Sequence, residues 1–191
     1  MKKIAIFASG NGSNAENIIK YFANSREVSI GLVLSNNIDA FVIQRAKKLN
    51  IPTQVFTRDE FSLTNNVLQY LTDKSIDFIV LAGFMWLVPE NILTQYSDKI
   101  INIHPALLPK YGGKGMYGNF VHKAVSVSGE KETGITIHFV NEKYDDGAII
   151  FQKSVQIESG ENYQTIAEKI HRLEYKYFPQ VIEKILLNLS E

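Results

Sequence analysis

Short apolar runs alternate with amphipathic segments over residues 3–103, and this alternation limits the chain to a small set of folds. The runs with strand character are Lys3–Ala8, Val28–Leu34, Ile51–Phe56, Ile76–Ala82 and Lys99–Ile103. Strands that alternate with helices predict a twisted, mostly parallel α/β sheet with helices on both faces. The almost uniformly apolar Ile76–Ala82 supports this prediction, because a strand that is covered on both faces has no polar side.

The predicted helices lie between these strands. The first runs from the SGNGSN segment to about Phe22, and Asp39 is expected to cap the second. Glu60–Thr72 is predicted to be one continuous helix, and Pro89 opens a short helix before the fifth strand. This order of elements is Rossmann-like.

Beyond residue 113 the pattern changes. The segment Gly112–Gly118 contains four glycines in seven residues and predicts a loop. The elements expected after it are a short helix, two antiparallel strands and a long closing helix: Val121–Val127, Thr133–Val140, Ala148–Ile157 and Tyr163–Leu187. No repeat, low-complexity tract or linker interrupts the chain, so we predict one domain over residues 1–191.

The composition excludes several classes of partner. Twenty basic residues balance twenty acidic ones, so no net field attracts nucleic acid or an anionic membrane. The absence of cysteine excludes disulfides and thiolate metal sites and fits a reducing compartment. The longest apolar run, Phe78–Val88, is 11 residues long and cannot span a bilayer. We therefore expect a soluble cytoplasmic protein with neither a nucleic-acid nor a membrane partner.

The segment KIINIHPALLPKYGG contains the first candidate for chemistry. Pro105 disfavours a helical backbone for His104, so His104 is expected to end a strand. Asn102 lies two residues earlier and points to the same side. In open α/β sheets, ligands bind outside the carboxyl ends of the strands. An isolated Asn-x-His-Pro is more often only a polar strand end, and the rest of the chain decides between the two interpretations.

A glycine-rich turn follows the first strand. Residues 10–15, GNGSNA, match the dinucleotide pattern G-x-G-x-x-[GA], but no carboxylate follows the second strand until Asp39. A nicotinamide site is therefore disfavoured. A phosphate at the helix amino terminus is the simpler hypothesis, with Gly12 permitting the turn and Ser13 and Asn14 adding donors.

Two further segments have a structural and a functional interpretation. Residues 81–88, LAGFMWLV, follow the fourth strand and could either pack in the core or form an apolar slot for a flat ring. Residues 144–147, YDDG, favour an ordinary β-turn. The functional alternative is that one of the two carboxylates folds back beside His104.

In combination these motifs are specific. The segments SGNGSN, LAGFM, NIHPALLPKY and GITIHFVNEKYDDG occur in this order. Together with the length, they resemble the folate-dependent phosphoribosylglycinamide formyltransferase family of purine synthesis over nearly the whole chain. The resemblance implies transfer of a formyl group from 10-formyltetrahydrofolate, as co-substrate, to the amine of 5-phosphoribosylglycinamide. It implies small-molecule partners, no metal, and a monomer or homodimer.

The resemblance also implies roles for individual residues. The catalytic residues of the family correspond to Asn102, His104 and Asp145. The residues implied to bind the ribonucleotide are Gly12, Ser13 and Asn14 for the phosphate, and Glu174. The residues implied to bind the folate are Arg58, Met85, Trp86, Leu87, Val88 and Asn102.

The chain departs from the family pattern at three places. Trp86 stands where the family often has arginine, and Asp146 where a small residue usually precedes the glycine. The segment between Pro109 and Thr133 is several residues longer than in common members. The roles of Asp146 and of the loop Gly112–Gly118 are therefore open at this stage.

The residue types suit an attack of an amine on a formyl carbon. Asn102 and a protonated His104 would donate hydrogen bonds to the developing oxyanion. Asp145 would favour the imidazolium form of His104 and could accept the proton of the amine. The four histidines lack zinc-ligand spacing. We interpret His138 as a structural strand residue, and a solvent-exposed helix face is the alternative for His171 and Glu174.

Other functions are less consistent with the sequence. A methionyl-tRNA formyltransferase carries a further carboxyl-terminal domain, and a formyltetrahydrofolate deformylase usually carries an amino-terminal regulatory domain; neither is expected here. A nicotinamide-dependent oxidoreductase needs an acidic residue at the end of the second strand, and this chain has none directly after Leu34. A non-catalytic nucleotide-binding module would not need the set of Asn102, His104 and Asp145.

Overall fold

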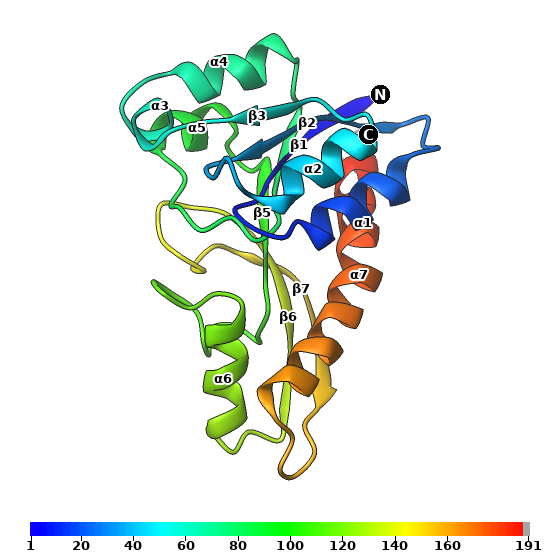
Figure 1. Ribbon diagram of the computed structural model, residues 1–191, viewed down its shortest axis with the longest axis vertical. Helices are drawn as coiled ribbons and strands as arrows, with labels where there is room; N and C mark the ends of the chain where they lie inside the picture. The colour runs from blue at the N-terminus through cyan, green and yellow to red at the C-terminus, as the bar shows by residue number, and fades with distance from the viewer. Residues whose placement is uncertain (189–191) are drawn as a thin grey trace.

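A seven-stranded sheet in the order β3-β2-β1-β4-β5-β6-β7 forms the centre of the computed structural model, which describes residues 1–188 (Figure 1). The strands are β1 (Lys2–Phe7), β2 (Val28–Ser35), β3 (Thr53–Val55), β4 (Phe78–Leu81), β5 (Ile100–His104), β6 (Glu132–Phe139) and β7 (Ile149–Gln156). Strands β1 to β5 are parallel, and β6 and β7 add to the β5 edge in antiparallel orientation. The predicted fold class is confirmed. Residues 189–191 of the expected domain lie outside the described residues.

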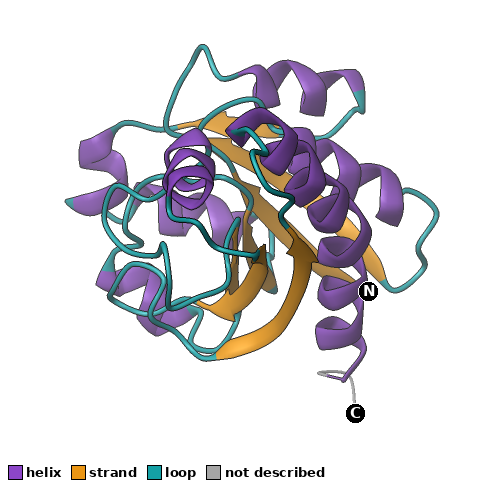
Figure 2. Ribbon diagram, turned by 90° about the horizontal axis from the view of Figure 1, so that it is seen from below, coloured by secondary structure: helices purple, strands orange, loops and turns teal. Residues whose placement is uncertain are grey.

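Helices cover both faces of this sheet (Figure 2). Alternate residues of β1 point to opposite sides, so that Ile4 and Ile6 join one apolar core and Ala5 and Phe7 join the other. The first core packs against α1 (Ser13–Phe22), α2 (Phe41–Lys48), α6 (Asn119–Val127) and α7 (Tyr163–Asn188). The second core packs against α3 (Arg58–Ser62), α4 (Asn66–Asp73) and α5 (Glu90–Gln95).

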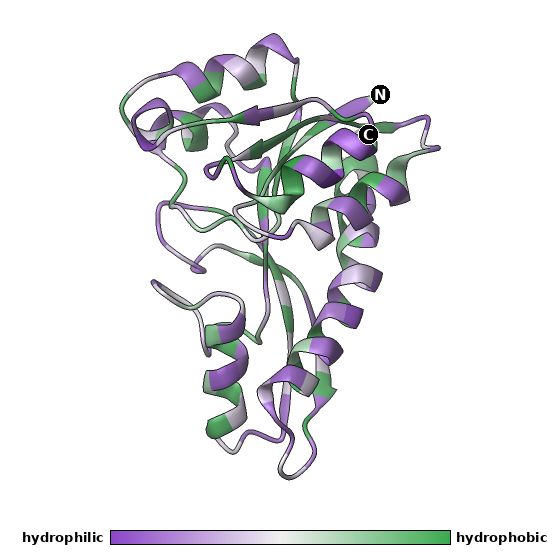
Figure 3. Cartoon of the chain, in the orientation of Figure 1, coloured by the Kyte–Doolittle hydropathy of each residue, from purple (hydrophilic) through white to green (hydrophobic). Residues whose placement is uncertain are grey.

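The hydropathy colouring shows hydrophobic residues along much of the central strands, whereas β3 is hydrophilic and the helices alternate between hydrophilic and hydrophobic residues (Figure 3). No helix within residues 1–188 is long and apolar enough to cross a membrane.

Two local predictions were wrong. The single helix expected over Glu60–Thr72 is divided into α3 and α4. The hydroxyl of Thr64 donates to the Glu60 carbonyl and accepts the N–H of Asn66, so it ends one helix and starts the next. Asp39 does not cap α2: the N-cap residue is Ala40, and the backbone N–H of Asp39 donates to the Asn37 side chain instead.

Helix α7 is fixed against α1 at a proline. Pro179 lies inside α7, and because proline has no N–H, the carbonyl of Tyr175 loses its helical donor. The side-chain amide of Asn17 on α1 donates to this carbonyl at 2.9 Å. The contact holds the middle of α7 beside the amino-terminal half of α1, which places Glu174 next to the phosphate loop predicted from the sequence.

Candidate active site

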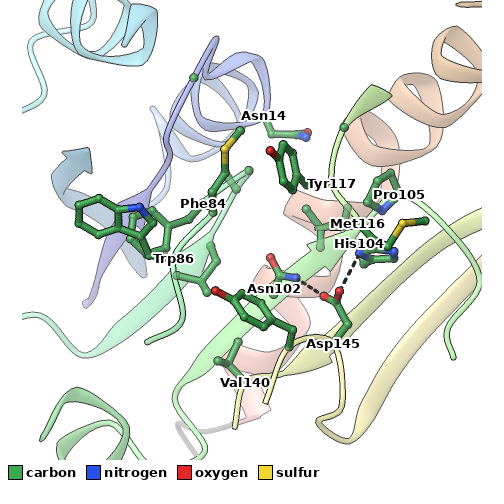
Figure 4. Close-up of a pocket in the computed structure, with 18 of the residues that line it drawn as sticks. Asn14, Phe84, Trp86, Asn102, His104, Pro105, Met116, Tyr117, Val140 and Asp145 are labelled. Carbon is green, nitrogen blue, oxygen red and sulfur yellow. Dashed lines mark hydrogen bonds and ion pairs between the residues drawn. The ribbon is translucent and has the colours of Figure 1, made fainter. Parts of the chain in front are cut away.

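A cavity of about 540 Å³ lies beyond the carboxyl ends of β1, β4 and β5 (Figure 4). Its lining comes from the loops after these strands, the loop before α6, the turn after β6, and helices α6 and α7. The lining includes Gly10–Asn14, Leu81–Val88, Asn102–Pro105, Gly113–Gly118, Lys143–Asp145, His122, His138, His171 and Glu174. Every site residue predicted from the sequence lines this cavity except Arg58.

Asn102, His104 and Asp145 converge at one point of the cavity. His104 Nδ1 lies 3.4 Å from Asp145 Oδ2, and Asn102 Nδ2 lies 3.5 Å from Asp145 Oδ1 (Figure 4). The side chains of His104 and Asp145 are almost fully buried, and Asn102 is partly buried. The strand end supplies the amide and the imidazole, and a turn more than forty residues later supplies the carboxylate.

The backbone of the turn after β6 aims Asp145 at these residues. Asp145 has a positive φ of 54°, which aspartate tolerates better than most residues. A Cβ at Gly147 would lie 1.8 Å from the Phe139 carbonyl oxygen, so only glycine allows the chain to return this closely to β6. The neighbouring Asp146 points to solvent, where its carboxylate contacts Lys143 at 3.8 Å. The turn therefore presents only one of the two carboxylates to His104.

The contacts of His104 favour its imidazolium form. Its Nε2 lies 2.8 Å from the carbonyl oxygen of Tyr111, and its Nδ1 faces the Asp145 carboxylate. Since both partners can only accept hydrogen bonds, each ring nitrogen is best satisfied when it carries a hydrogen.

Asp145 is held in its ionised form. Burial by itself would raise the pKa of the carboxyl, but the contact with His104 and the N–H of Gly113 act against burial. Their combined effect lowers the pKa well below its usual value. Asp145 is therefore a carboxylate at neutral pH, with both oxygens in contact with protein donors.

His138 belongs to the same cluster, which the sequence analysis did not predict. It lies opposite Asn102 in the antiparallel pair of β5 and β6. Its Nδ1 is 2.7 Å from the Phe139 carbonyl oxygen and donates to it, which leaves Nε2 to accept from Asn102 Nδ2 at 3.1 Å. This contact turns the amide nitrogen of Asn102 toward the cluster and its oxygen away from Asp145 (Figure 4).

The predicted phosphate loop forms the other end of the cavity. Gly12 has φ 74°, and a Cβ there would lie 2.4 Å from the Cβ of Val42. The turn therefore needs glycine for its dihedral angle and for its close approach to α2. Ser13 begins α1, and the first N–H groups of a helix have no partner within that helix, so they are available to an anion in the cavity.

Glu174 is buried beside this loop and does not face solvent, so the alternative of an exposed helix face was wrong for this residue. Its carboxyl accepts a hydrogen bond from Asn14 Nδ2 at 2.9 Å, while Asn14 Oδ1 is buried without a hydrogen-bond partner. Burial raises the pKa of Glu174 to about 7, and the bond from Asn14 offsets only part of this effect.

The segment after β4 forms a third wall. The N–H of Met85 donates to the Ser9 hydroxyl at 3.0 Å, which ties this segment to the end of β1. Val88 is buried and Trp86 packs against the second apolar core, whereas Met85 and Leu87 are partly exposed. Val88 and Trp86 therefore pack in the core, whereas Met85 and Leu87 are exposed to the cavity, so each of the two interpretations is correct for part of the segment. Arg58, which does not line the cavity, stacks on the ring of Trp86, with its guanidinium carbon 4.8 Å from the ring centroid.

Comparison with known proteins agrees with this arrangement. Residues 2–182 match the Formyl transferase family. The chain belongs to the formyl transferase family. A phosphoribosylglycinamide formyltransferase from Bacillus subtilis (strain 168) is 37% identical over 191 residues, which cover 97% of this chain and 95% of that protein.

Solved structures of the same kind resemble this formyltransferase along its length. The phosphoribosylglycinamide formyltransferase from Bacillus halodurans is 36% identical, with a TM-score of 0.86 and coverage of 97% of this chain and 95% of that chain. Glycinamide ribonucleotide transformylase 1 from Geobacillus kaustophilus is 34% identical, with a TM-score of 0.89 and coverage of 97% and 99%. The resemblance inferred from the sequence motifs is confirmed.

The family uses formyltetrahydrofolate as co-substrate. Among residues 1–188 of this formyltransferase, no group of three or more His, Cys, Asp or Glu side chains is arranged to hold a metal ion.

The raised pKa of Glu174 predicts a dependence of stability on pH. The native carboxyl keeps its proton up to about pH 7, whereas the unfolded one loses it near its usual value of 4.5, so unfolding releases a proton between these values. The contribution of Glu174 to stability therefore falls as the pH rises from 4.5 to 7, by up to about 3 kcal/mol. Glu174→Gln removes the ionisation and is expected to unfold at a higher urea concentration than the unsubstituted protein at pH 8, with little difference near pH 4.5.

Urea unfolding of the two proteins at both pH values measures this effect. All other titrating groups are the same in the two proteins. A change with pH in the difference between their unfolding free energies therefore reports the ionisation of Glu174 alone. A difference that is the same at both pH values would show that Glu174 is not a buried acid of raised pKa.

Proposed function

We propose that this protein transfers the formyl group of 10-formyltetrahydrofolate to the amine of 5-phosphoribosylglycinamide in purine biosynthesis. The observation that carries the proposal is the meeting of Asn102, His104 and Asp145 between two chemically different ends of one cavity. One end offers a helix amino terminus for a phosphate, and Glu174 for sugar hydroxyls. The other offers the apolar segment Leu81–Val88 for a flat ring.

In this proposal the reacting groups meet at Asn102. The ribonucleotide places its phosphate at Gly12, Ser13 and Asn14 and extends its amine toward the cluster. The folate pocket is lined by Met85, Trp86, Leu87 and Val88. The formyl group of the bound folate faces the amine of the ribonucleotide. Because the ligands are small molecules, we place the enzyme in the cytoplasm without nucleic-acid or membrane partners, as a monomer or homodimer.

The attack of the amine turns the formyl carbon tetrahedral and puts negative charge on its oxygen. Of the two hydrogens on Asn102 Nδ2, the one facing Asp145 at 3.5 Å is only weakly bound and can turn to this oxygen. The positive charge of His104 stabilises the same oxygen. Groups of this kind, fixed in a site that excludes water, are each worth about 3 kcal/mol in the transition state.

The site supports Asp145 as a charge partner more than as a base. Its lowered pKa makes the carboxylate a weak proton acceptor near neutral pH. The proton that the amine loses must reach N10 of the departing folate, and a water molecule between the two nitrogens can transfer it. Asp145 meanwhile keeps His104 charged and in position.

Mixing the purified protein with both substrates tests the proposal. Formation of tetrahydrofolate, followed by its absorbance, should depend on the ribonucleotide, and the formylated ribonucleotide should appear in equal amount. Release of formate without the ribonucleotide would instead indicate a deformylase. Transfer to methionyl-tRNA in place of the ribonucleotide would indicate the tRNA-directed enzyme.

Gly12→Ala is expected to raise the KM for the ribonucleotide by at least about tenfold and to leave the KM for the folate within about twofold. The new Cβ would meet Val42 and would also strain the positive φ, so the helix N–H groups move away from the phosphate. Steady-state kinetics with each substrate varied in turn measure the two constants. An unchanged ribonucleotide KM would remove the phosphate from this loop.

A further inference from the structure

The imidazole of His122 is buried in the wall of the cavity, and neither the fold nor the catalytic cluster uses its nitrogens. His122 lies on the buried side of α6 with Val121 and Val125, and only 2% of its surface is exposed. Within residues 1–188 neither ring nitrogen has a hydrogen-bond partner. Most buried polar side-chain atoms in proteins have such a partner, and burying one without it costs stability. The cavity is therefore lined here by a polar group that packing alone does not explain.

The ring of His122 is uncharged and presents a hydrogen-bond donor. Burial, followed by the neighbouring His171 and His104, lowers the pKa of His122 to about 4, so the ring is neutral near pH 7. Its Nδ1 is shielded from solvent, which leaves Nε2 as the nitrogen that can reach the cavity. A buried N–H without a partner is rarer than a buried acceptor without one, so the single hydrogen belongs on Nε2. His122 therefore offers the cavity one uncharged N–H group.

His122 lies between the two ends of the proposed ribonucleotide site. Its ring meets His171 of α7 edge to face, with centroids 6.1 Å apart and ring planes at 88°. His171 is one helical turn before Glu174, and both line the cavity. In the other direction, His104 of the catalytic cluster is near enough to influence the pKa of His122. A ribonucleotide that extends from the phosphate loop to the cluster therefore brings its middle part to His122.

The middle part of 5-phosphoribosylglycinamide is an amide. The phosphate and the sugar hydroxyls have proposed partners at the amino terminus of α1 and at Glu174, and the amine reacts beside Asn102. The amide carbonyl, between the sugar and the amine, has none. A carbonyl oxygen accepts hydrogen bonds and carries no net charge, which matches an uncharged N–H. A charged ring at this position would be repelled by the imidazolium of His104.

We propose that His122 recognises the amide carbonyl of the ribonucleotide through its Nε2–H, and so distinguishes this substrate from sugar phosphates that lack the amide. The inference rests on the proposed function and extends it to the part of the substrate that neither the phosphate loop nor the catalytic cluster contacts. His122 lies in the segment whose length departs from the family pattern. It determines specificity and takes no part in the formation or cleavage of bonds.

His122→Phe and His122→Gln test this contact by steady-state kinetics. Phenylalanine keeps a flat ring beside His171 but has no donor, whereas the amide nitrogen of glutamine can take the place of Nε2. His122→Phe should raise the KM for the ribonucleotide by about tenfold and change kcat and the folate KM by less than about threefold. His122→Gln should recover most of the loss. An unchanged ribonucleotide KM in His122→Phe, or equal losses in the two variants, would overturn the inference.

Ribose 5-phosphate shows which part of the substrate His122 contacts, because it has the phosphate and the sugar but no amide. It should compete with the ribonucleotide, and its inhibition constant in His122→Phe should stay within about twofold of that in the unsubstituted protein. An inhibition constant that rises as much as the ribonucleotide KM would place His122 at the sugar or the phosphate, which the inference does not allow.

The pH separates an uncharged donor from a cation. Because the pKa of about 4 keeps the ring neutral, His122→Phe should raise the ribonucleotide KM by the same factor at about pH 6 and about pH 8. A factor that falls as the pH rises would mean that His122 acts as an imidazolium, for which the phosphate is the suitable partner, and would contradict recognition of the carbonyl.

Two controls separate the possible failures. His122→Phe replaces an unpartnered polar ring by an apolar one of similar shape, so it should unfold at the same or a higher temperature; a marked decrease would assign His122 a structural role instead. Lys123→Gln changes the next residue of α6, which contacts the ring of Tyr163 and does not line the cavity, and should leave every constant unchanged. If the unsubstituted protein transfers no formyl group, the proposed function fails, whereas full transfer with an unchanged ribonucleotide KM in His122→Phe rejects only the role of His122.

Discussion

Asp145→Asn is expected to lower kcat by roughly 10²–10³-fold, while Asp146→Asn should lower it by less than about tenfold. Asp145 keeps the imidazolium of His104 charged and aligned, and it lies 3.4 Å from that ring. Asp146 faces Lys143 on the outside of the same turn. Both substitutions remove one negative charge from the same turn. The large difference between their effects on kcat therefore follows from the direction of each side chain.

Asparagine is the appropriate replacement at position 145. Like aspartate, it tolerates the positive φ of 54°, so the turn should keep its shape. An alanine would add backbone strain to the loss of charge. The measurement is kcat at saturating concentrations of both substrates, with circular dichroism and thermal unfolding as controls of folding. A larger loss in Asp146→Asn than in Asp145→Asn would show that the other carboxylate is the partner of His104.

Local signals were sufficient for the fold and for one part of the site. The alternation of apolar and amphipathic segments determines a parallel sheet, and Pro105 determines that His104 ends a strand. Because both constraints act over a few residues, they can be read without tertiary structure. The division between α3 and α4 was missed because it depends on hydrogen bonds of a single hydroxyl, that of Thr64, which hydrophobic periodicity does not report.

Contacts between distant segments explain the remaining differences. From the sequence, Glu174 is expected on a solvent-exposed face of its helix. It is buried because the hydrogen bond from Asn17 to the Tyr175 carbonyl holds α7 against α1. His138 looks like an ordinary strand residue because its role depends on the register of β6 against β5. A shift of one residue in that register would point His138 to the opposite face of the sheet, away from Asn102. Sequence patterns indicate which faces are buried, but not which residue lies opposite which.

His138→Leu is therefore expected to lower kcat by about 10²-fold while changing neither KM by more than about threefold. Leucine fills the volume of the imidazole but cannot accept the hydrogen bond from Asn102 Nδ2, so the amide is free to rotate. The formyl oxygen then loses a donor held in a fixed direction. The folate and the ribonucleotide still bind, because their proposed contacts lie elsewhere in the cavity.

The same argument predicts that His138 acts only through Asn102. Asn102→Ala should lower kcat by at least as much as His138→Leu. The kcat of the double variant should be little lower than that of Asn102→Ala alone. His138→Gln, which keeps an acceptor on its side-chain oxygen, should recover part of the lost activity. Additive losses in the double variant would mean that His138 has a separate role, such as direct contact with substrate. Since Asn102 and His138 are opposite each other in adjacent strands, strong coupling is the result that the register requires.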